Sequence, residues 1–119
     1  MPRRVKLGPA APVRSHDELK RQMARRLVAT HPEESYESRA PQVLLAVPVL
    51  QIELQADGSV RRVIVLREPH QARETVQMAI DAVRRAAPFG SVQALKQPWV
   101  FTESFLFDYD KRFKPRTLE

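Results

Sequence analysis

The stretch that decides the fold is Val49-Leu-Gln-Ile-Glu-Leu-Gln-Ala-Asp-Gly-Ser-Val-Arg-Arg-Val-Ile-Val-Leu66. Apolar and polar side chains alternate over its first six residues, which is the period of a strand with one buried face. Asp57-Gly58 predicts a tight hairpin turn, because a type I′ turn needs positive φ at both central positions. A second, Val-rich strand follows the turn, so the stretch is typical of a β-hairpin.

The length of the turn fixes the pairing of the two strands. A two-residue loop places apolar residues together on one face and an opposite-charge pair on the other. The expected pairs are Leu50 with Val65, Ile52 with Val63, and Glu53 with Arg62. A three-residue loop with a bulge would slip this register by one residue, and we prefer the two-residue form for its consistency.

The sequence on either side of the hairpin predicts two helices and one more strand. Upstream, Ser15-His-Asp-Glu18 matches a capping box, and apolar residues then recur at helical spacing until Pro32 stops the helix near Thr30. Downstream, residues 72–87 carry the same spacing between Pro69 and Pro88. Residues 99–107 alternate large aromatic side chains with smaller ones, and Glu103 interrupts the aromatic row.

This order of elements predicts an α+β fold with two layers. We expect a three-stranded antiparallel sheet of order 2-1-3, with two helices on one face and strands 2 and 3 as the edges. Residues 1–14 are predicted to be a flexible basic arm and residues 15–107 a single domain. Residues 108–119 are predicted to be a charged, loosely held tail in which Phe113 could dock.

Composition narrows the function classes. The chain has 119 residues, no cysteine and a net charge of +6. Nine basic and five acidic residues fall within 1–40, so much of the excess charge lies in the arm, which is weaker evidence for nucleic acid than a basic folded face. No apolar run approaches the ~20 residues of a membrane-spanning helix. No signal peptide is recognised, so we expect either a cytosolic protein or an exported domain separated from its targeting segment.

Three segments resemble the C-terminal domain of the TonB/TolA family of periplasmic energy transducers. They are Leu50-Gln-Ile-Glu-Leu-Gln-Ala-Asp-Gly-Ser-Val60 with Val63-Ile-Val-Leu66, Ala79-Ile-Asp-Ala-Val-Arg-Arg-Ala-Ala-Pro-Phe89, and Trp99-Val-Phe-Thr-Glu-Ser-Phe-Leu-Phe107. In that family an Asp-Gly hairpin leads to a Val-rich strand, a helix ending in a similar phrase and a closing strand. The resemblance covers about half of the chain.

The resemblance implies a non-catalytic domain that binds an extended peptide of an outer-membrane or periplasmic protein. Such a domain would lie in the bacterial periplasm, anchored to the inner membrane through a segment absent from this chain. Without the resemblance, a cytoplasmic location is the alternative. Binding would add a strand to the third strand, whose backbone groups supply the affinity. The expected partner-binding residues are Val100, Phe101, Thr102, Glu103, Ser104, Phe105 and Leu106.

Catalytic signals are few. The three histidines have no partner at metal-ligand spacing, so we read them as solvated surface residues and expect no metal, no cofactor and no enzyme activity. Arg84 and Arg85 are a candidate anion contact, although cations also suit the last turn of a helix.

Two other function classes stay open. One is a nucleic-acid-binding module that uses the basic arm and the helix at 15–30. The other is a structural subunit of an envelope assembly that dimerises through its strand edges, where Ile64 and Leu66 would face away from the helices.

Overall fold

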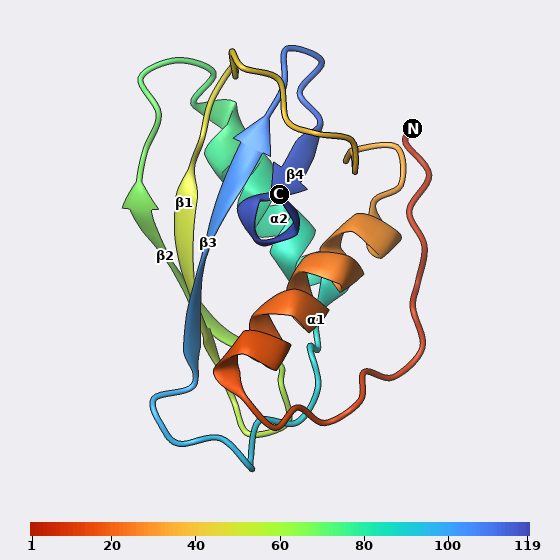
Figure 1. Ribbon diagram of the computed structural model, residues 1–119, viewed down its shortest axis with the longest axis vertical. Helices are drawn as coiled ribbons and strands as arrows, with labels where there is room; N and C mark the ends of the chain where they lie inside the picture. Colours follow the sequence, from red (N-terminus) through yellow and green to blue (C-terminus); the bar gives the residue numbers. More distant parts are fainter.

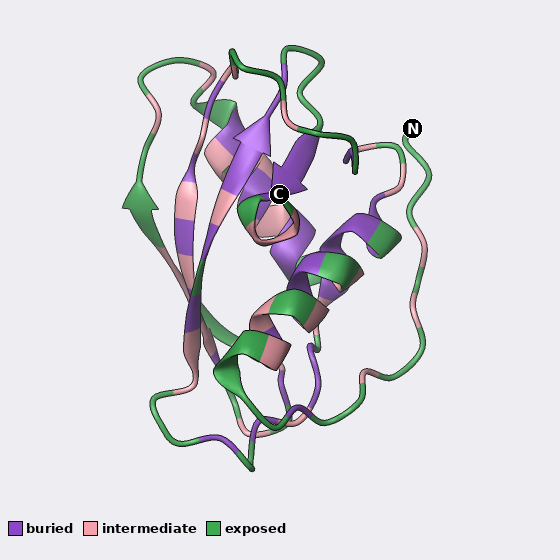
Figure 2. Ribbon diagram, in the orientation of Figure 1, coloured by how far each residue is buried: buried purple, intermediate pink, exposed green.

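The first helix begins where the capping box predicts. In the computed structural model, which describes all 119 residues, α1 spans His16–Thr30 and the Ser15 hydroxyl accepts a hydrogen bond from the Glu18 amide at 3.0 Å. This side chain satisfies one of the amides that a helix start leaves without a partner. The apolar stripe of α1 is buried, and its charged face points to solvent (Figures 1 and 2).

The predicted hairpin forms β1, Val49–Leu54, and β2, Val60–Arg67. All three expected pairs are present: Leu50 with Val65, Ile52 with Val63, and Glu53 with Arg62. The preferred two-residue loop is wrong, because Gln55 donates to the Ser59 carbonyl across a loop of three residues in which Gly58 has φ +86°. A bulge at Arg61 then absorbs the one-residue slip, so the predicted register is restored before Arg62.

The second helix and the third strand follow in the predicted order. α2 spans Glu74–Ala86, and β3 spans Val100–Phe107 and pairs antiparallel with β1. The prediction of three strands is wrong in number. A short strand, β4, Phe113–Pro115, pairs with the far side of β3, so the sheet has four strands in the order β2-β1-β3-β4.

The tail is therefore a structured part of the fold. After β4, residues Arg116–Leu118 form a short 3₁₀ helix, η1. The Lys114 side chain is buried, and its ammonium group bonds the Glu119 carboxylate at 2.6 Å and the Ser38 carbonyl at 3.0 Å. The tail is thus tied to the connector between α1 and β1, which corrects the expectation that it is loosely held.

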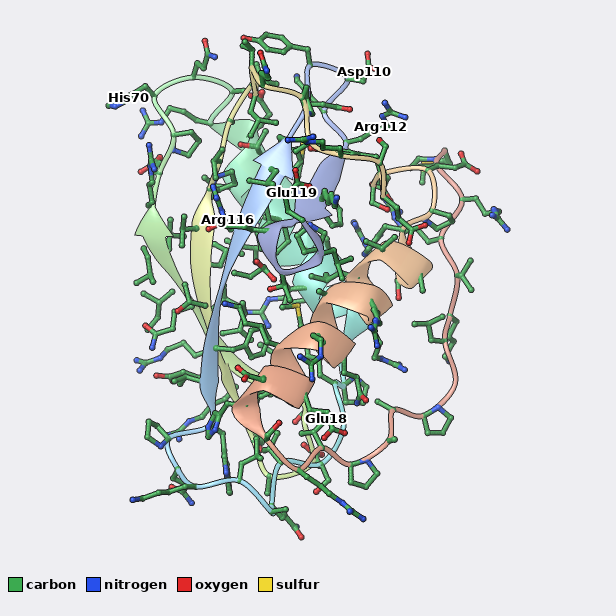
Figure 3. All side chains as sticks on the ribbon, viewed as in Figure 1. Glu18, His70, Asp110, Arg112, Arg116 and Glu119 are labelled. Carbon is green, nitrogen blue, oxygen red and sulfur yellow. The ribbon has the colours of Figure 1, made fainter.

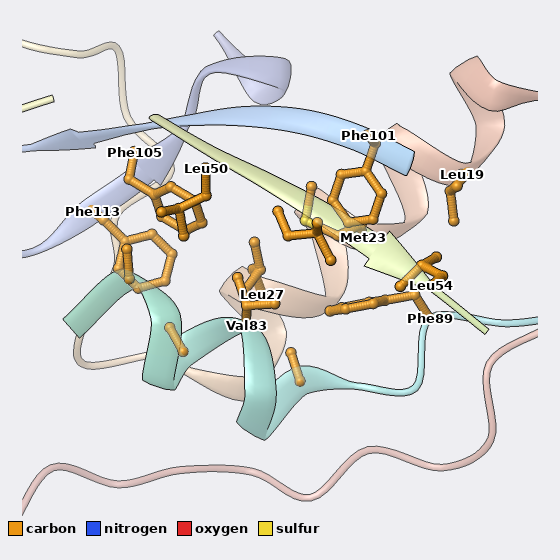
Figure 4. Close-up of a cluster of buried hydrophobic side chains, with 14 of the residues drawn as sticks. Leu19, Met23, Leu27, Leu50, Leu54, Val83, Phe89, Phe101, Phe105 and Phe113 are labelled. Carbon is orange, nitrogen blue, oxygen red and sulfur yellow. The ribbon is translucent and has the colours of Figure 1, made fainter. Parts of the chain in front are cut away.

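The core lies between the sheet and the two helices, which cover one face of the sheet (Figure 1). Figure 4 shows Leu50 of β1 on the sheet side and Leu27 of α1 and Val83 of α2 on the helix side of the core, with Leu54 of β1 beside Phe89. Phe105 of β3 and Phe113 of β4 lie together at one end of this layer, and Phe101 of β3 lies toward the other end, near Met23. The opposite face of the sheet carries no helix, as the α+β prediction requires.

The N-terminal arm runs along the helical layer, and hydrogen bonds and a buried side chain fix its position. The Val5 amide donates to the Thr30 carbonyl at 2.9 Å, and Val13 is fully buried. The Val13 amide also donates a hydrogen bond to the Ser91 carbonyl at 3.1 Å. The arm therefore covers part of the core.

Candidate functional site: the two edges of the sheet

The predicted partner-binding strand, β3, is covered along half of its outer edge. Phe105 and Leu106 already pair with Pro115 and Lys114 of β4. Residues 105 and 107 donate their amides to the chain that leads into β1, so alternation directs the backbone groups of Val100, Thr102, Ser104 and Leu106 outward. Of these four, Leu106 pairs with β4, and the Ser104 amide donates to the Glu103 carboxylate at 3.0 Å. The edge that remains open on β3 is the short stretch Val100–Thr102.

Glu103, which interrupts the aromatic row, is a buried carboxylate that fixes the tail. Its side chain accepts hydrogen bonds from the hydroxyl and the amide of Thr117 in η1. Burial raises the pKa of Glu103, and the bonds from Thr117 and Ser104 and the nearby charge of Lys20 only partly oppose this rise. Glu103 therefore supports the local fold from inside, and its carboxylate does not face a partner.

We expect replacement of Glu103 by Gln to change how stability depends on pH. Because the pKa is higher in the folded protein than its ordinary value of 4.5, the folded state holds the proton more tightly than the unfolded chain does. Stability contributed by Glu103 is thus lost as pH rises above 4.5 through the folded pKa. Urea unfolding of both proteins from acid to neutral pH should show Glu103→Gln gaining relative to the wild type as pH rises. If the difference in unfolding free energy between the two proteins did not change with pH, this assignment would be contradicted.

The other edge, β2, is open along its length. It pairs with β1 on one side and has no strand on the other. The Leu54 amide donates to Trp99 beside β3, and the Gln55 amide donates to Ser59 in the hairpin. Alternation along β1 then directs Gln51 and Glu53 toward β2. Ile64 and Arg62, which lie opposite these two residues, direct their backbone groups toward β1. The amides and carbonyls of Val63 and Val65 therefore point into solvent.

Exposed apolar side chains accompany the free backbone groups of β2. Val65 is 40% exposed and Leu66 is 52% exposed, in a chain that has few large apolar residues on its surface. Figure 2 shows the C-terminal end of β2 as exposed. No proline lies within β2, and its apolar centre, Val63–Leu66, carries no charge. Charged side chains and bulges commonly protect edge strands, and β2 has them only toward its two ends, so its centre is the part that can pair.

A hollow of about 710 Å³ lies beside the hairpin end of this edge. It is lined by Glu53 to Ala56, Arg61, Arg62 and Gln97 to Val100. The Arg62 guanidinium makes two bonds to the Glu53 carboxylate, at 2.9 and 3.0 Å, and this bond holds the pKa of Glu53 below its usual range. Arg61, the residue of the bulge, has no carboxylate partner. It is therefore the unpaired cation of the hollow.

The structure separates the two arginines of the candidate anion contact. Both are exposed, but only Arg85 lines a hollow of about 300 Å³ between the arm and the helix ends, where Lys6 and Arg26 also lie. Arg84 lies outside this hollow. The two arginines therefore do not form one site.

One histidine is placed differently from the prediction. His31 is fully buried, and its two ring nitrogens lie 3.2 Å from the Glu34 carboxylate and 3.1 Å from the Ala82 carbonyl. Burial tends to raise the pKa of Glu34, but hydrogen bonds from Arg4 and His31 outweigh this and lower it. His31 therefore joins the end of α1 to α2, which corrects its assignment as a surface residue. His70 does lie at the surface, on the connection that follows β2 (Figure 3).

No cluster of three or more His, Asp or Glu side chains could hold a metal ion, and none of the helices has the length and apolar character needed to cross a membrane. Comparison with known protein families, curated proteins and solved structures finds no significant match. The geometry of the two sheet edges is therefore the structural basis for a proposed function.

Proposed function

We propose that this protein is a non-catalytic interaction domain that receives an extended peptide segment as an additional strand, and that the receiving edge is β2. The observation that carries the proposal is that β2, with eight residues, is paired on one side only. In strand addition, main-chain hydrogen bonds give the affinity and side-chain contacts give the register. Val63 and Val65 present the free main-chain groups, and Val65 and Leu66 present apolar surface.

The mode of binding is strand addition, as expected from the sequence, but the receiving strand is β2 and not β3. On β3, only Val100 and Thr102 still direct backbone groups outward without a partner in the chain. An added strand there would meet β4 and η1 after a few residues. On β2 an added strand can run past the whole apolar centre, so the longer edge is the better receptor.

The resemblance to TonB/TolA C-terminal domains supports a role in the bacterial envelope. The partner would then be an extended segment of a periplasmic or outer-membrane protein, and the domain would work in transport across the envelope. Any tie to the inner membrane would be made by a segment outside this chain.

Amide hydrogen exchange can test the receiving edge. The probe is an uncharged peptide, acetyl-Thr-Val-Thr-Val-Thr-Val-Thr-amide, and the control is the same peptide N-methylated at alternate residues so that it cannot pair. We expect the Val63 and Val65 amides to exchange rapidly in the free protein and slowly with the first peptide. The N-methylated peptide should give no protection.

A variant separates backbone pairing from contact with side chains. Val65→Pro removes an amide that points to solvent, and proline is tolerated on edge strands. It should abolish the protection at Val63, whereas Val65→Thr should retain it, with both variants checked for folding by circular dichroism. Protection at Thr102 in place of Val63 would return the site to β3, and protection at neither would reject strand addition.

A further inference from the structure

The charges along β2 are arranged in a pattern that selects its occupant. Arg61 and Arg67 are exposed at the two ends of the strand, and neither forms an ion pair. The other nearby charges are compensated, since Arg62 bonds Glu53 and Glu68 bonds Arg73 at 2.6 Å. The edge therefore carries two arginines without an ion-pair contact, and they flank the apolar centre.

The bulge gives the first of these cations a defined place. Arg61 is the extra residue between the Leu54–Val60 and Glu53–Arg62 pairs, and it is one of the residues that line the 710 Å³ hollow. The Glu53 carboxylate nearby is already held by two bonds from Arg62. A carboxylate brought in by a partner would thus meet Arg61 as a free cation beside space for a side chain.

Resting on the proposed function, we propose that the segment bound by β2 is acidic at both ends and apolar in its centre. Its two carboxylates pair with Arg61 and Arg67, which lie six positions apart in β2, and its central residues cover Val63 to Leu66. Opposite charges placed directly across a strand pair are favourable, and like charges are not.

The same charges disfavour a second copy of this chain as the occupant. If two β2 strands paired antiparallel about Ile64, Arg61 of each copy would lie opposite Arg67 of the other. Two such contacts between like charges would flank the interface, with no acidic residue inside β2 to relieve them. At these two positions an acidic partner would form favourable opposite-charge contacts, whereas a second copy would form unfavourable like-charge contacts.

Three peptides with one apolar centre test the inference. They are acetyl-Xaa-Val-Thr-Val-Thr-Val-Xaa-amide with Glu, Gln or Lys at both ends, titrated while the Val63 and Val65 amides are followed by NMR. Each exposed ion pair accounts for about threefold in affinity, so we expect the Glu peptide to bind about tenfold more tightly than the Gln peptide. The Lys peptide should bind more weakly than either. Added salt should reduce the affinity of the Glu peptide most, because exposed pairs are screened.

The double variant Arg61→Gln, Arg67→Gln should bind the Glu and Gln peptides equally. The control variant, Arg84→Gln, removes an exposed arginine at the end of α2 and should keep the tenfold ratio. If all three peptides bind equally, the charge preference is refuted while strand addition stands. If none perturbs Val63 and Val65, strand addition itself fails. If those amides shift with protein concentration and no peptide, a second copy is the occupant and the inference is overturned.

Discussion

Gly90→Ala is expected to destabilise the fold by more than ~3 kcal/mol, because steric overlap and backbone strain act together. Gly90 has φ +102°, a conformation that residues with a side chain rarely adopt. A Cβ at this position would lie 2.1 Å from the Ala11 carbonyl oxygen and 2.6 Å from the Gln22 amide nitrogen. These two groups are bonded to each other at 2.8 Å, so neither can move away freely.

The hairpin turn shares this tight packing. A Cβ on Gly58 would lie 2.1 Å from the Gly90 carbonyl oxygen, and the Phe89 amide donates to the Gly58 carbonyl at 2.9 Å. Gly58→Ala should therefore be destabilising as well.

Urea unfolding of the two variants and of a matched control measures these effects. Gly8 is the control, because a Cβ there would meet nothing within 4 Å. Gly8→Ala should leave the free energy of unfolding within about 0.5 kcal/mol of the wild type. Equal effects at Gly8 and Gly90 would show that the contact between the arm and the loop after α2 does not stabilise the protein.

Phe113→Ala is expected to cost about 3–5 kcal/mol, the usual range for deleting a buried aromatic ring. The Phe113 ring is 3% exposed and packs against Phe105 and Phe107, with ring centroids 5.5 and 5.8 Å away. The His31 ring contacts it edge-on at 6.0 Å. Its loss would leave a cavity between β3 and α1 and would loosen β4.

The control for this prediction lies four residues away. Tyr109, in the loop between β3 and β4, is 62% exposed, so Tyr109→Ala should change the unfolding free energy by less than about 0.5 kcal/mol. Figure 3 shows Asp110 and Arg112 of the same loop at the surface. If Phe113→Ala were as mild as Tyr109→Ala, docking of the tail would not stabilise the fold.

The hairpin, the helices and β3 could be predicted because their signals are local. Alternation in β1, the Asp57-Gly58 turn and the capping box at Ser15 each depend on neighbouring residues. The bulge at Arg61 could not be predicted, because it arises from the competition between a three-residue loop and the pairing of apolar faces. The pairing alone implied the observed register of the strands with a two-residue loop, and the three-residue loop alone would have implied a register slipped by one residue.

The tail and His31 could not be predicted because their partners are distant in sequence. Lys114 is buried only because the Ser38 carbonyl and Glu119 satisfy its charge. His31 is buried only because the Ala82 carbonyl lies within 3.1 Å. Glu103 was recognised as an interruption of the aromatic row, but its partner Thr117 lies in a helix of three residues that has no sequence signature.

The fourth strand has a consequence for assembly. A sheet with two free edges can add copies at both sides and grow into a fibre, as edge strands of aggregating proteins do. Here β4 and η1 cover β3 except at Val100–Thr102, and the backbone of Phe113 in β4 bonds in turn to Glu34 and Tyr36, so each molecule offers one long edge. Pairing through β2 then ends with the first partner, which makes strand addition by this domain self-terminating.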